Sequence, residues 1–406
     1  MKPWTFLISV LLFVVICSAC QSGSSDDDSS GDDSFDDDIN DDDIVDDDID
    51  DDVDDDVTPP VDDDTTPLDD DIDDDTTPSD DDTTPPDDDD VDDDTTPSDD
   101  DTVDDDSTYS WSEMTSGTTA WLYGVWGSSA TDVFAVGGGT ILHYDGSSWS
   151  AMTIDNTSVN FRAVWGSSAT NVYAVGVGGT FDLPYGAMSH YDGSSWLGVF
   201  RTSAFLGGVW GSSATDVFAV GAEFDGGMSP TKTAILHYDG SSWSEMATPS
   251  GIKTYLAGVW GSSPSDVFAV SDSGKILHYD GSSWSLMTCV SKVELTGVWG
   301  SSASDVFAVG YNDKNLGVIL HYDGSSWSIM TVDTIRVNFA GVWGSSASDV
   351  FAVGAYKLGK SIMHYDGSSW LLMTNGINAA LSGVWGSSAS DVFAVGWNGM
   401  ILHYGD

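Results

Sequence analysis

Seven histidines recur at one position of a repeated unit, and they are the first residues to consider for chemistry. They are His143, His190, His237, His278, His321, His364 and His403, each followed by Tyr. Imidazole can ligate a metal or transfer a proton. We expect these histidines on the third strand of each unit, towards the outside, where they lie too far apart to share an ion. The preferred interpretation is a repeated structural hydrogen bond, so no metal site and no cofactor is predicted.

An acid opens the second strand of nearly every unit. The occupants of this position are Asp132, Asn171, Asp216, Asp266, Asp305, Asp349 and Asp391. The amide of Asn171 can accept the hydrogen bond of an Asx turn, but it carries no charge. This substitution favours turn capping over metal ligation or acid catalysis.

The marker of the repeat is the pentapeptide V-W-G-S-S. Its tryptophans are Trp126, Trp165, Trp210, Trp260, Trp299, Trp343 and Trp385. They are 39 to 50 residues apart, and the segments between them are short, rich in Val, Phe, Tyr and Trp, and separated by Gly/Ser/Asp turns. This period is typical of four-stranded propeller blades. The sequence therefore predicts an all-β fold, a seven-bladed β-propeller of four-stranded blades.

The first unit shows where the four strands fall. We expect strands ending at residues 124–126, covering 133–136 and 141–144, and surrounding Trp149. Asp145-Gly146 predicts a two-residue type I′ hairpin between the third and fourth strands, because that turn needs positive φ at both central positions.

The two ends of the repeat region predict how the ring closes. The seventh H-Y motif, His403-Tyr404, is followed by two residues and no S-S-W, whereas residues 110–114 match residues 148–152 in type. We therefore expect Trp111 to supply the outer strand of the seventh blade, which leaves few exposed sheet edges.

The units across residues 107–406 resemble kelch-type propeller repeats. D-V-F-A-V-G is similar to the kelch second strand, and Tyr144 with Trp149 is similar to its Tyr/Trp pair, but only Gly137-Gly138 supplies the kelch Gly-Gly. D-G-S-S-W also resembles the Asp-box of sialidase-like propellers, without the spacer between Asp and Gly. Both resemblances imply a propeller, and neither implies one function.

Catalysis is not predicted, because no nucleophile, base and orienting group together break the repeat pattern. Sialidases of this architecture need clustered arginines, but Arg162, Arg201 and Arg336 occupy dissimilar repeat positions. Copper oxidases of the kelch-like type need His and Cys ligands outside the repeat, which are missing. We therefore predict a non-enzyme with no catalytic residues, and a glycosidase is the less favoured alternative.

Fourteen of the 17 tryptophans occupy the V-W-G position or its S-S-W counterpart, Trp111 included. The favoured role is as buried indoles packing between neighbouring blades, and the alternative is as platforms that stack on sugars.

The start of the chain predicts export. Residues 1–20 contain Lys2, an apolar run and then Ile16-Cys17-Ser18-Ala19-Cys20. This segment resembles a bacterial lipobox, which implies a lipoprotein-type signal peptide, lipidation of Cys20 and a membrane anchor. If the sorting rule of that family applies, Gln21 implies the outer membrane or cell surface. The alternative is an ordinary cleaved signal with an incidental Cys.

Residues 21–106 form an acidic linker. Residues 26–106 contain 45 Asp and no Lys or Arg, out of a net charge of −57 for the chain. Such a tract cannot bury enough apolar surface to fold, so we expect a disordered tether. Its carboxylates could associate loosely with Ca²⁺ but lack an EF-hand pattern. The acidic balance argues against nucleic acid as a partner.

The sequence variation predicts the binding face of the domain at 107–406. Alternating strand directions place the one-to-two and three-to-four loops on one face, and these loops are nearly invariant. The two-to-three and four-to-one loops share the other face and vary. The candidate binding residues there are Phe181, Tyr185, Phe224, Lys232, Tyr311, Lys314, Tyr356, Lys357 and Trp397.

Three functions remain open for this domain. The first is a non-catalytic module that binds one asymmetric protein partner through the variable loops. The second is a multivalent lectin with one weak site for a surface glycan in each blade, built from the repeated Trp, Asp and His. The third is a surface spacer or adhesin without a specific ligand.

Overall fold

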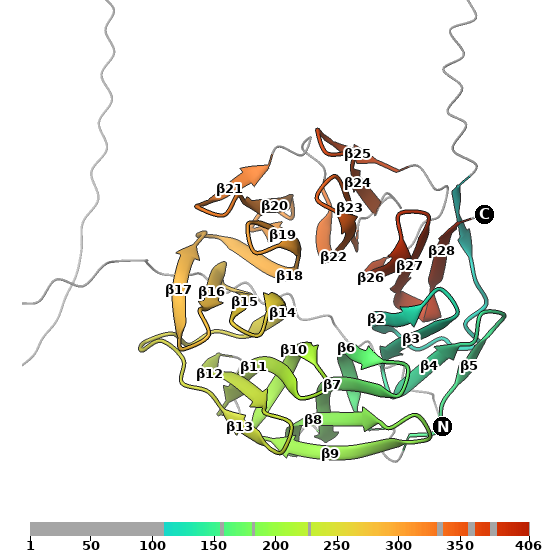
Figure 1. Cartoon of the computed structure of the whole chain (residues 1–406), viewed down its shortest axis with the longest axis horizontal. Helices are drawn as coiled ribbons and strands as arrows, with labels where there is room; N and C mark the ends of the chain where they lie inside the picture. Colours follow the sequence, from blue (N-terminus) through green and yellow to red (C-terminus); the bar gives the residue numbers. More distant parts are fainter. Residues whose placement is uncertain are drawn as a thin grey trace, which may run out of the picture. The chain divides into compact units, whose positions relative to one another are not determined.

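The described part of the chain is a closed ring of seven four-stranded antiparallel sheets (Figure 1), which confirms the predicted all-β propeller. The computed structural model describes residues 109–154, 158–180, 183–225, 229–330, 336–355, 362–373 and 380–405. The predicted signal segment 1–20, with Cys20, and the linker 21–106 lie outside the described residues. In the described ranges no helix is long and apolar enough to cross a membrane.

Each blade contributes four strands, numbered from the centre outwards in blades 1 to 6. Blade 1 contains β2 (Leu122–Ser129), β3 (Asp132–Gly137), β4 (Thr140–Tyr144) and β5 (Trp149–Ala151); blade 2 contains β6 (Asn160–Ser168), β7 (Asn171–Thr180), β8 (Leu183–Tyr191) and β9 (Trp196–Thr202). Blade 3 contains β10 (Ala204–Ser213), β11 (Asp216–Phe224), β12 (Pro230–Tyr238) and β13 (Trp243–Glu245); blade 4 contains β14 (Leu256–Ser263), β15 (Asp266–Ser271), β16 (Lys275–Tyr279) and β17 (Trp284–Cys289). Blade 5 contains β18 (Val293–Ser302), β19 (Asp305–Asn312), β20 (Gly317–Tyr322) and β21 (Trp327–Met330); blade 6 contains β22 (Asn338–Ser346), β23 (Asp349–Ala355), β24 (Ile362–Tyr365) and β25 (Trp370–Leu372). Blade 7 contains β26 (Leu381–Ser388), β27 (Asp391–Gly396), β28 (Ile401–Gly405) and, as its outer strand, β1 (Ser110–Glu113), with the 3-10 turn η1 (Trp397–Gly399) between β27 and β28.

The ring closes through the first strand of the described chain, as predicted. β1 pairs antiparallel with β28, with Trp111 opposite Tyr404 and Glu113 opposite Leu402. The indole of Trp111 is buried, and its Nε1–H donates to Sδ of Met373 in blade 6 at 3.4 Å. Blade 7 therefore has the same outer strand as the other blades, although that strand comes from the other end of the repeat region.

The V-W-G tryptophans pack between neighbouring blades. A Cβ built on Gly300 of blade 5 would lie 2.6 Å from Cη2 of Trp260 in blade 4. The same contact joins Trp126 to Gly166, Trp165 to Gly211, Trp210 to Gly261, Trp299 to Gly344, Trp343 to Gly386 and, across the closure, Trp385 to Gly127. None of these glycines has a positive φ, so backbone conformation does not require glycine there. The close approach of the indole is the reason for the glycine.

The outer S-S-W tryptophans strengthen the same interfaces from the opposite side. Nε1–H of Trp149 in blade 1 donates to Sδ of Met114 at 3.5 Å, and its ring packs edge-on against Phe393 of blade 7 at 6.1 Å. In blade 3 the outer Trp243 packs edge-on against Tyr173 of blade 2 in the same way. Such aromatic pairs add to the stabilisation from buried apolar area.

The predicted type I′ turn at Asp145-Gly146 is wrong. Tyr144 pairs with Trp149, which leaves a four-residue loop, and only Gly146 in it has a positive φ, +89°. Oδ1 of Asp145 accepts the backbone N–H groups of Ser147 and Ser148, both at 2.9 Å. The side chain closes the loop in place of a tight backbone turn. The hydrogen bond from the Ser147 hydroxyl contributes most to lowering the pKa of Asp145 to about 2.

Replacing Gly300 with Ala should destabilise the propeller by about 1–3 kcal/mol, because the added methyl overlaps the Trp260 indole and the backbone oxygen of Asp305. The measurement is the midpoint of urea unfolding followed by tryptophan fluorescence. Gly198→Ala is the matched control, since a Cβ there meets nothing within 4 Å. Equal midpoints for the two variants would contradict the packing argument.

Candidate functional site

The two faces of the disc differ in sequence and in chemistry. The "constant face" is the one with the loops between first and second and between third and fourth strands of each blade. The "variable face" has the remaining loops, which join second to third strands and one blade to the next. The antiparallel register of every blade supports this assignment.

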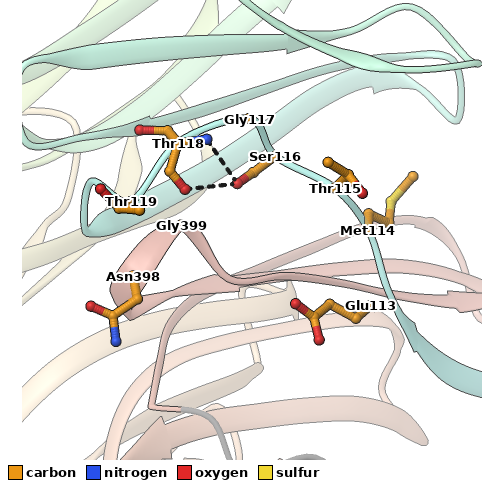
Figure 2. Close-up of a pocket in the computed structure, with 9 residues that line it drawn as sticks. All are labelled: Glu113, Met114, Thr115, Ser116, Gly117, Thr118, Thr119, Asn398 and Gly399. Carbon is orange, nitrogen blue, oxygen red and sulfur yellow. Dashed lines mark hydrogen bonds between the residues drawn. The ribbon is translucent and has the colours of Figure 1, made fainter.

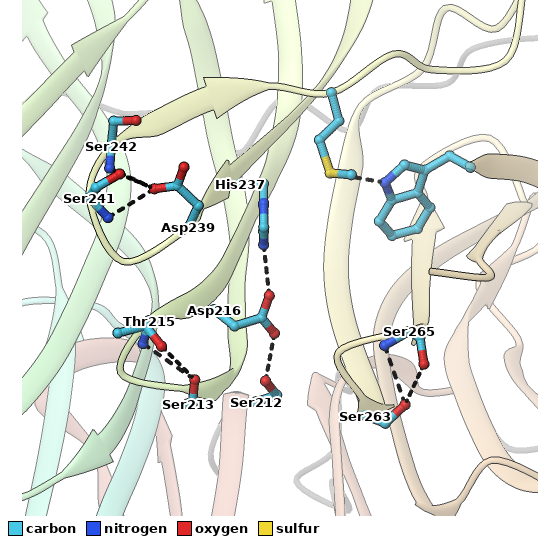
Figure 3. Close-up of polar contacts among 12 residues, drawn as sticks. Ser212, Ser213, Thr215, Asp216, His237, Asp239, Ser241, Ser242, Ser263 and Ser265 are labelled. Carbon is cyan, nitrogen blue, oxygen red and sulfur yellow. Dashed lines mark hydrogen bonds and ion pairs between the residues drawn. The ribbon is translucent and has the colours of Figure 1, made fainter. Parts of the chain in front are cut away.

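A Ser–Asp–His network recurs on the constant face, and Figure 3 shows the copy in blade 3. There, Oγ of Ser212 donates to Oδ2 of Asp216 at 2.5 Å, and Oδ1 of Asp216 lies 2.7 Å from Nε2 of His237. The same His–Asp distance joins His143 to Asp132, His278 to Asp266, His321 to Asp305, His364 to Asp349 and His403 to Asp391. The repeated histidine position therefore makes a repeated hydrogen bond. The prediction that the acid opening the second strand caps a turn did not include its hydrogen bond to this histidine. The acid links the serine of the first strand to the histidine of the third.

The order of groups in this network does not suit hydrolysis. In a nucleophilic triad the imidazole lies between the hydroxyl and the carboxylate and removes the hydroxyl proton. Here the carboxylate of Asp132 lies in the middle, and the Ser128 hydroxyl donates to it. The imidazole of His143 packs on Phe134 with ring centroids 4.7 Å apart. Among the described residues, no three His, Cys, Asp or Glu side chains are grouped to hold a metal ion.

Blade 2 shows that the network tolerates an uncharged centre. Nδ2 of Asn171 donates to Oγ of Ser167 at 2.7 Å, and its Oδ1 lies 2.6 Å from Nε2 of His190. Because an amide oxygen only accepts, Nε2 of His190 carries the hydrogen. Burial lowers the pKa of His190, with a smaller opposing effect from Asp192.

Charge is divided unequally between the faces. The constant face presents six aspartates of the Ser–Asp–His networks, and six more in the three-to-four loops: Asp145, Asp192, Asp239, Asp280, Asp323 and Asp366. Every Lys and Arg in the described ranges lies at the variable face: Arg162, Arg201, Lys232, Lys253, Lys275, Lys292, Lys314 and Arg336. A charged partner can therefore distinguish the two faces at a distance.

The predicted binding residues do not form one cluster. Tyr185 lies under the guanidinium of Arg201, with Cζ 4.3 Å from the ring centroid. Lys232 forms ion pairs with Glu245 at 2.5 Å and Glu223 at 3.5 Å. Further members are Lys314, exposed in the loop after β19, and Trp397, which stacks on Trp121 at 4.6 Å. Phe181, Tyr356 and Lys357 lie outside the described residues.

A β-bulge near the start of every innermost strand creates a second set of variable positions. In β2 the register shifts between Leu122 and Gly124, so one extra residue is left without a partner in β3. The extra residues of the seven blades are Tyr123, Arg162, Gly207, Ala257, Thr296, Ala340 and Ser382. We define the "inner rim" as these residues together with the variable-face ends of the two innermost strands of each blade.

Aromatic side chains cover one side of the inner rim. Phe205 stacks on Phe224 at 5.1 Å, and Phe224 contacts Tyr255 of blade 4 at 6.3 Å. Oη of Tyr255 reaches Gly207, where a Cβ would lie 2.6 Å from it. Burial raises the pKa of Tyr255, and the positive charge of Arg162 opposes that shift. The guanidinium of blade 2 is thus within electrostatic reach of blade 4.

Two acidic residues of the inner rim, Asp272 and Glu294, lie on blades 4 and 5. Oγ1 of Thr254 donates to Oδ1 of Asp272 at 2.9 Å, and the hydroxyl of Tyr311 donates to the carboxylate of Glu294. Burial raises the pKa of Asp272. Burial also raises the pKa of Glu294, and the negative charge of Asp272 adds to that shift. The two carboxylates therefore affect each other across the blade boundary.

Sequence reasoning found only part of the inner rim. Phe224 and Tyr311 were among the predicted residues, whereas Arg162, Asp272 and Glu294 were not. For Arg162 the available signal was the residue directly before G-V-W, or A-V-W in blade 2, which varies inside an otherwise constant motif. Its importance depends on the bulge, which the sequence pattern did not predict.

Comparison with known proteins supports the fold. No protein-family model matches the chain, and no curated protein matches it. YCF48 bound to a D1 peptide is 16% identical over 73% of this chain and 97% of that one, with a TM-score of 0.56. A catalytically inactive virginiamycin B lyase from Staphylococcus aureus, with quinupristin, is 11% identical over 73% and 99%, with a TM-score of 0.58. A GH74 enzyme from Niastella koreensis is 13% identical over 72% and 53%, with a TM-score of 0.56.

All three proteins are at most 16% identical to this chain, so these likenesses show the fold alone. The fold and the variable face define this chain as a β-propeller repeat protein.

Replacing Asn171 with Asp should raise the pKa of His190, because a carboxylate stabilises the imidazolium ion and the neutral amide does not. In the parent the lowered pKa of His190 costs folded-state stability as pH falls through the unfolded-state value, and the variant should reduce that loss. The His190 resonance is followed by NMR titration, with His190→Gln assigning the signal. An unchanged His190 titration in the variant would contradict the proposed network.

Proposed function

We propose that the propeller is a non-catalytic binding module that holds a segment of a protein partner at the inner rim of its variable face. The observation that carries this proposal is the asymmetry of the inner rim. Arg162, the aromatic set around Phe224 and Tyr255, and the acids Asp272 and Glu294 come from different blades, although the scaffold repeats seven times. An asymmetric site selects one ligand in one orientation, which a repeated site does not.

The chemistry of the inner rim suits a peptide with mixed side chains. Stacked aromatic rings offer a rigid apolar contact with little loss of side-chain entropy. The carboxylates of Asp272 and Glu294 are partly desolvated, so a Lys, Arg or amino group of the partner would recover favourable electrostatic energy there. YCF48, one of the similar propellers, is recorded with a bound peptide, which supports a peptide as a ligand for this fold.

Glycoside hydrolysis is the competing function. Glycosidases use two carboxyl groups: one with a raised pKa protonates the leaving group, and the other stays ionised and stabilises the developing positive charge. Asp272 and Glu294 are two such carboxyl groups, each with a raised pKa, and a GH74 enzyme is among the similar structures. The hydrogen bonds from Thr254 and Tyr311 already occupy these carboxylates, which favours a structural and binding role.

A multivalent lectin is supported less well. Its seven sites would need the repeated Trp, Asp and His residues. In the structure the repeated aspartates and histidines bond each other, and the V-W-G tryptophans pack on the glycines of the next blade. Little of their hydrogen-bonding capacity is left for a sugar.

We further propose that the chain is exported, lipidated on Cys20 and held at the outer membrane or cell surface by residues 21–106. The lipobox-like segment and the acidic composition support this. The path of the chain also agrees, because Ser110 pairs with Gly405 at the constant-face end of β28. The chain enters the propeller there, so the variable face is directed away from the point of entry.

The test of the binding proposal is selection of ligands from a random peptide library displayed on phage, using the full chain. Soluble polyaspartate is added to remove peptides that bind the acidic tract. Asp272→Asn and Glu294→Gln should each weaken binding of the selected synthetic peptides about tenfold, because each removes a charge-assisted contact. Isothermal titration calorimetry measures the change.

Asp313→Asn is the matched control, since Asp313 is an exposed acid on the same face of blade 5 but outside the inner rim. Its peptide affinity should equal that of the parent. Peptides that bind both inner-rim variants as tightly as the parent would overturn the assignment of the site. Hydrolysis of chromogenic glycosides that Asp272→Asn or Glu294→Gln abolishes would overturn the non-catalytic function.

A further inference from the structure

A polar pocket of about 590 Å³ lies at the seam where the ring closes (Figure 2). Two segments line it: residues 113–119, which lead from β1 to β2, and Asn398-Gly399 of η1. None of these residues belongs to the inner rim. The pocket volume is within the range of small-molecule sites, which is about 300–1,000 Å³.

The wall of the pocket is fixed by contacts between its two segments. Gly399 has φ +72°, and a Cβ there would lie 2.0 Å from the backbone oxygen of Thr118. Oγ of Ser116 donates to that oxygen at 3.3 Å, and Oγ1 of Thr118 accepts the N–H of Ala120 at 3.1 Å. The connection therefore has a defined shape before any ligand binds, which reduces the entropy cost of binding.

Four exposed polar side chains of the pocket have no protein partner among the described residues and are available to a ligand. The carboxylate of Glu113, the hydroxyls of Thr115 and Thr119, and the amide of Asn398 make no hydrogen bond or ion pair with another side chain or backbone group in the described ranges. Figure 2 shows Glu113, Thr119 and Asn398 around the backbone of Gly399. The set offers both donors and acceptors, with only one charge.

This combination fits a polyhydroxylated ligand better than a cation. A sugar hydroxyl can donate to the carboxylate of Glu113 while another accepts from Nδ2 of Asn398, so each ligand group satisfies one protein group. A divalent cation would need several oxygen ligands of higher charge, and no acidic group of three is present in the described part of the chain.

Two tryptophans lie close in sequence to the two lining segments, although neither lines the pocket itself. Trp121 follows the first segment and Trp397 directly precedes the second, and their rings stack at 4.6 Å with planes 5° apart. Both indoles are partly exposed. Their stacking joins the two lining segments and so helps to fix the shape of the pocket.

We propose that this seam pocket binds a neutral sugar, as a mono- or disaccharide unit of a larger glycan, with Glu113 and Asn398 holding its hydroxyls. The site occurs once, at the junction of blades 7 and 1. It is independent of the peptide-binding inner rim, and it differs from a lectin with one site in every blade.

The test uses the full chain on an array of neutral glycans, followed by calorimetry with the free oligosaccharide of the strongest signal. Glu113→Gln and Asn398→Ala should each weaken the affinity for that oligosaccharide about tenfold, because the first replaces a charge-assisted hydrogen bond with a neutral one and the second removes a hydrogen bond. Thr119→Val is a third variant that keeps the volume of the side chain and should also weaken binding.

Two matched controls should bind like the parent. Glu245→Gln changes the acid at the same repeat position in blade 3, and Asn315→Ala removes an asparagine with the same φ of 56° from the equivalent loop of blade 5. Thermal midpoints verify that every variant is folded. Absence of any neutral glycan signal, or equal loss of affinity in pocket and control variants, would overturn the proposal; neither outcome affects the peptide-binding proposal.

Discussion

The fit of an indole against a glycine of the next blade is the constraint on which the propeller depends. The contact occurs at all seven junctions, including Trp385 with Gly127, where the last blade meets the first. Any side chain at these glycines would collide with the indole, so each blade fixes the position of the following one. Because the ring is closed, a change at one junction is transmitted around the whole circle, and few sheet edges remain open to other chains.

This requirement explains why one face of the disc repeats and the other varies. The Ser–Asp–His networks tie the first, second and third strands of each blade together at the constant face, so their residues have little freedom to change. In the described part of the variable face, a repeated contact is made by the methionine at the end of the outer strand, whose sulfur accepts the Nε1–H of the outer Trp of the next blade. Sequence differences accumulate elsewhere on that face, together with all the Lys and Arg of the described ranges, and supply the asymmetry that binding of one partner needs.

The sequence was sufficient to predict the architecture because the repeat period, the strand composition and the unmatched strand at 110–114 all pointed to one closed ring. It also identified which face varies. Local turn geometry was predicted less well: Asp145-Gly146 read as a tight hairpin, whereas the side chain of Asp145 closes a longer loop. The inner rim depends on a bulge that brings Tyr123 and Arg162 into contact, and on long-range neighbours such as Asp272 and Glu294. Such contacts follow from register and tertiary distance, which a pattern along the chain does not encode.

The direction of β1 has a mechanical consequence. The strand starts at the constant face and runs towards the variable face, and its hydrogen bonds to β28 are perpendicular to that path. A partner held on the variable face and a pull on the preceding chain would load the strand along its length, in shear. All the residue pairs from Ser110 to Glu113 would then share the tension, whereas a sideways pull would open them one at a time. The strand that closes the ring is thus oriented to resist detachment under a load along its length.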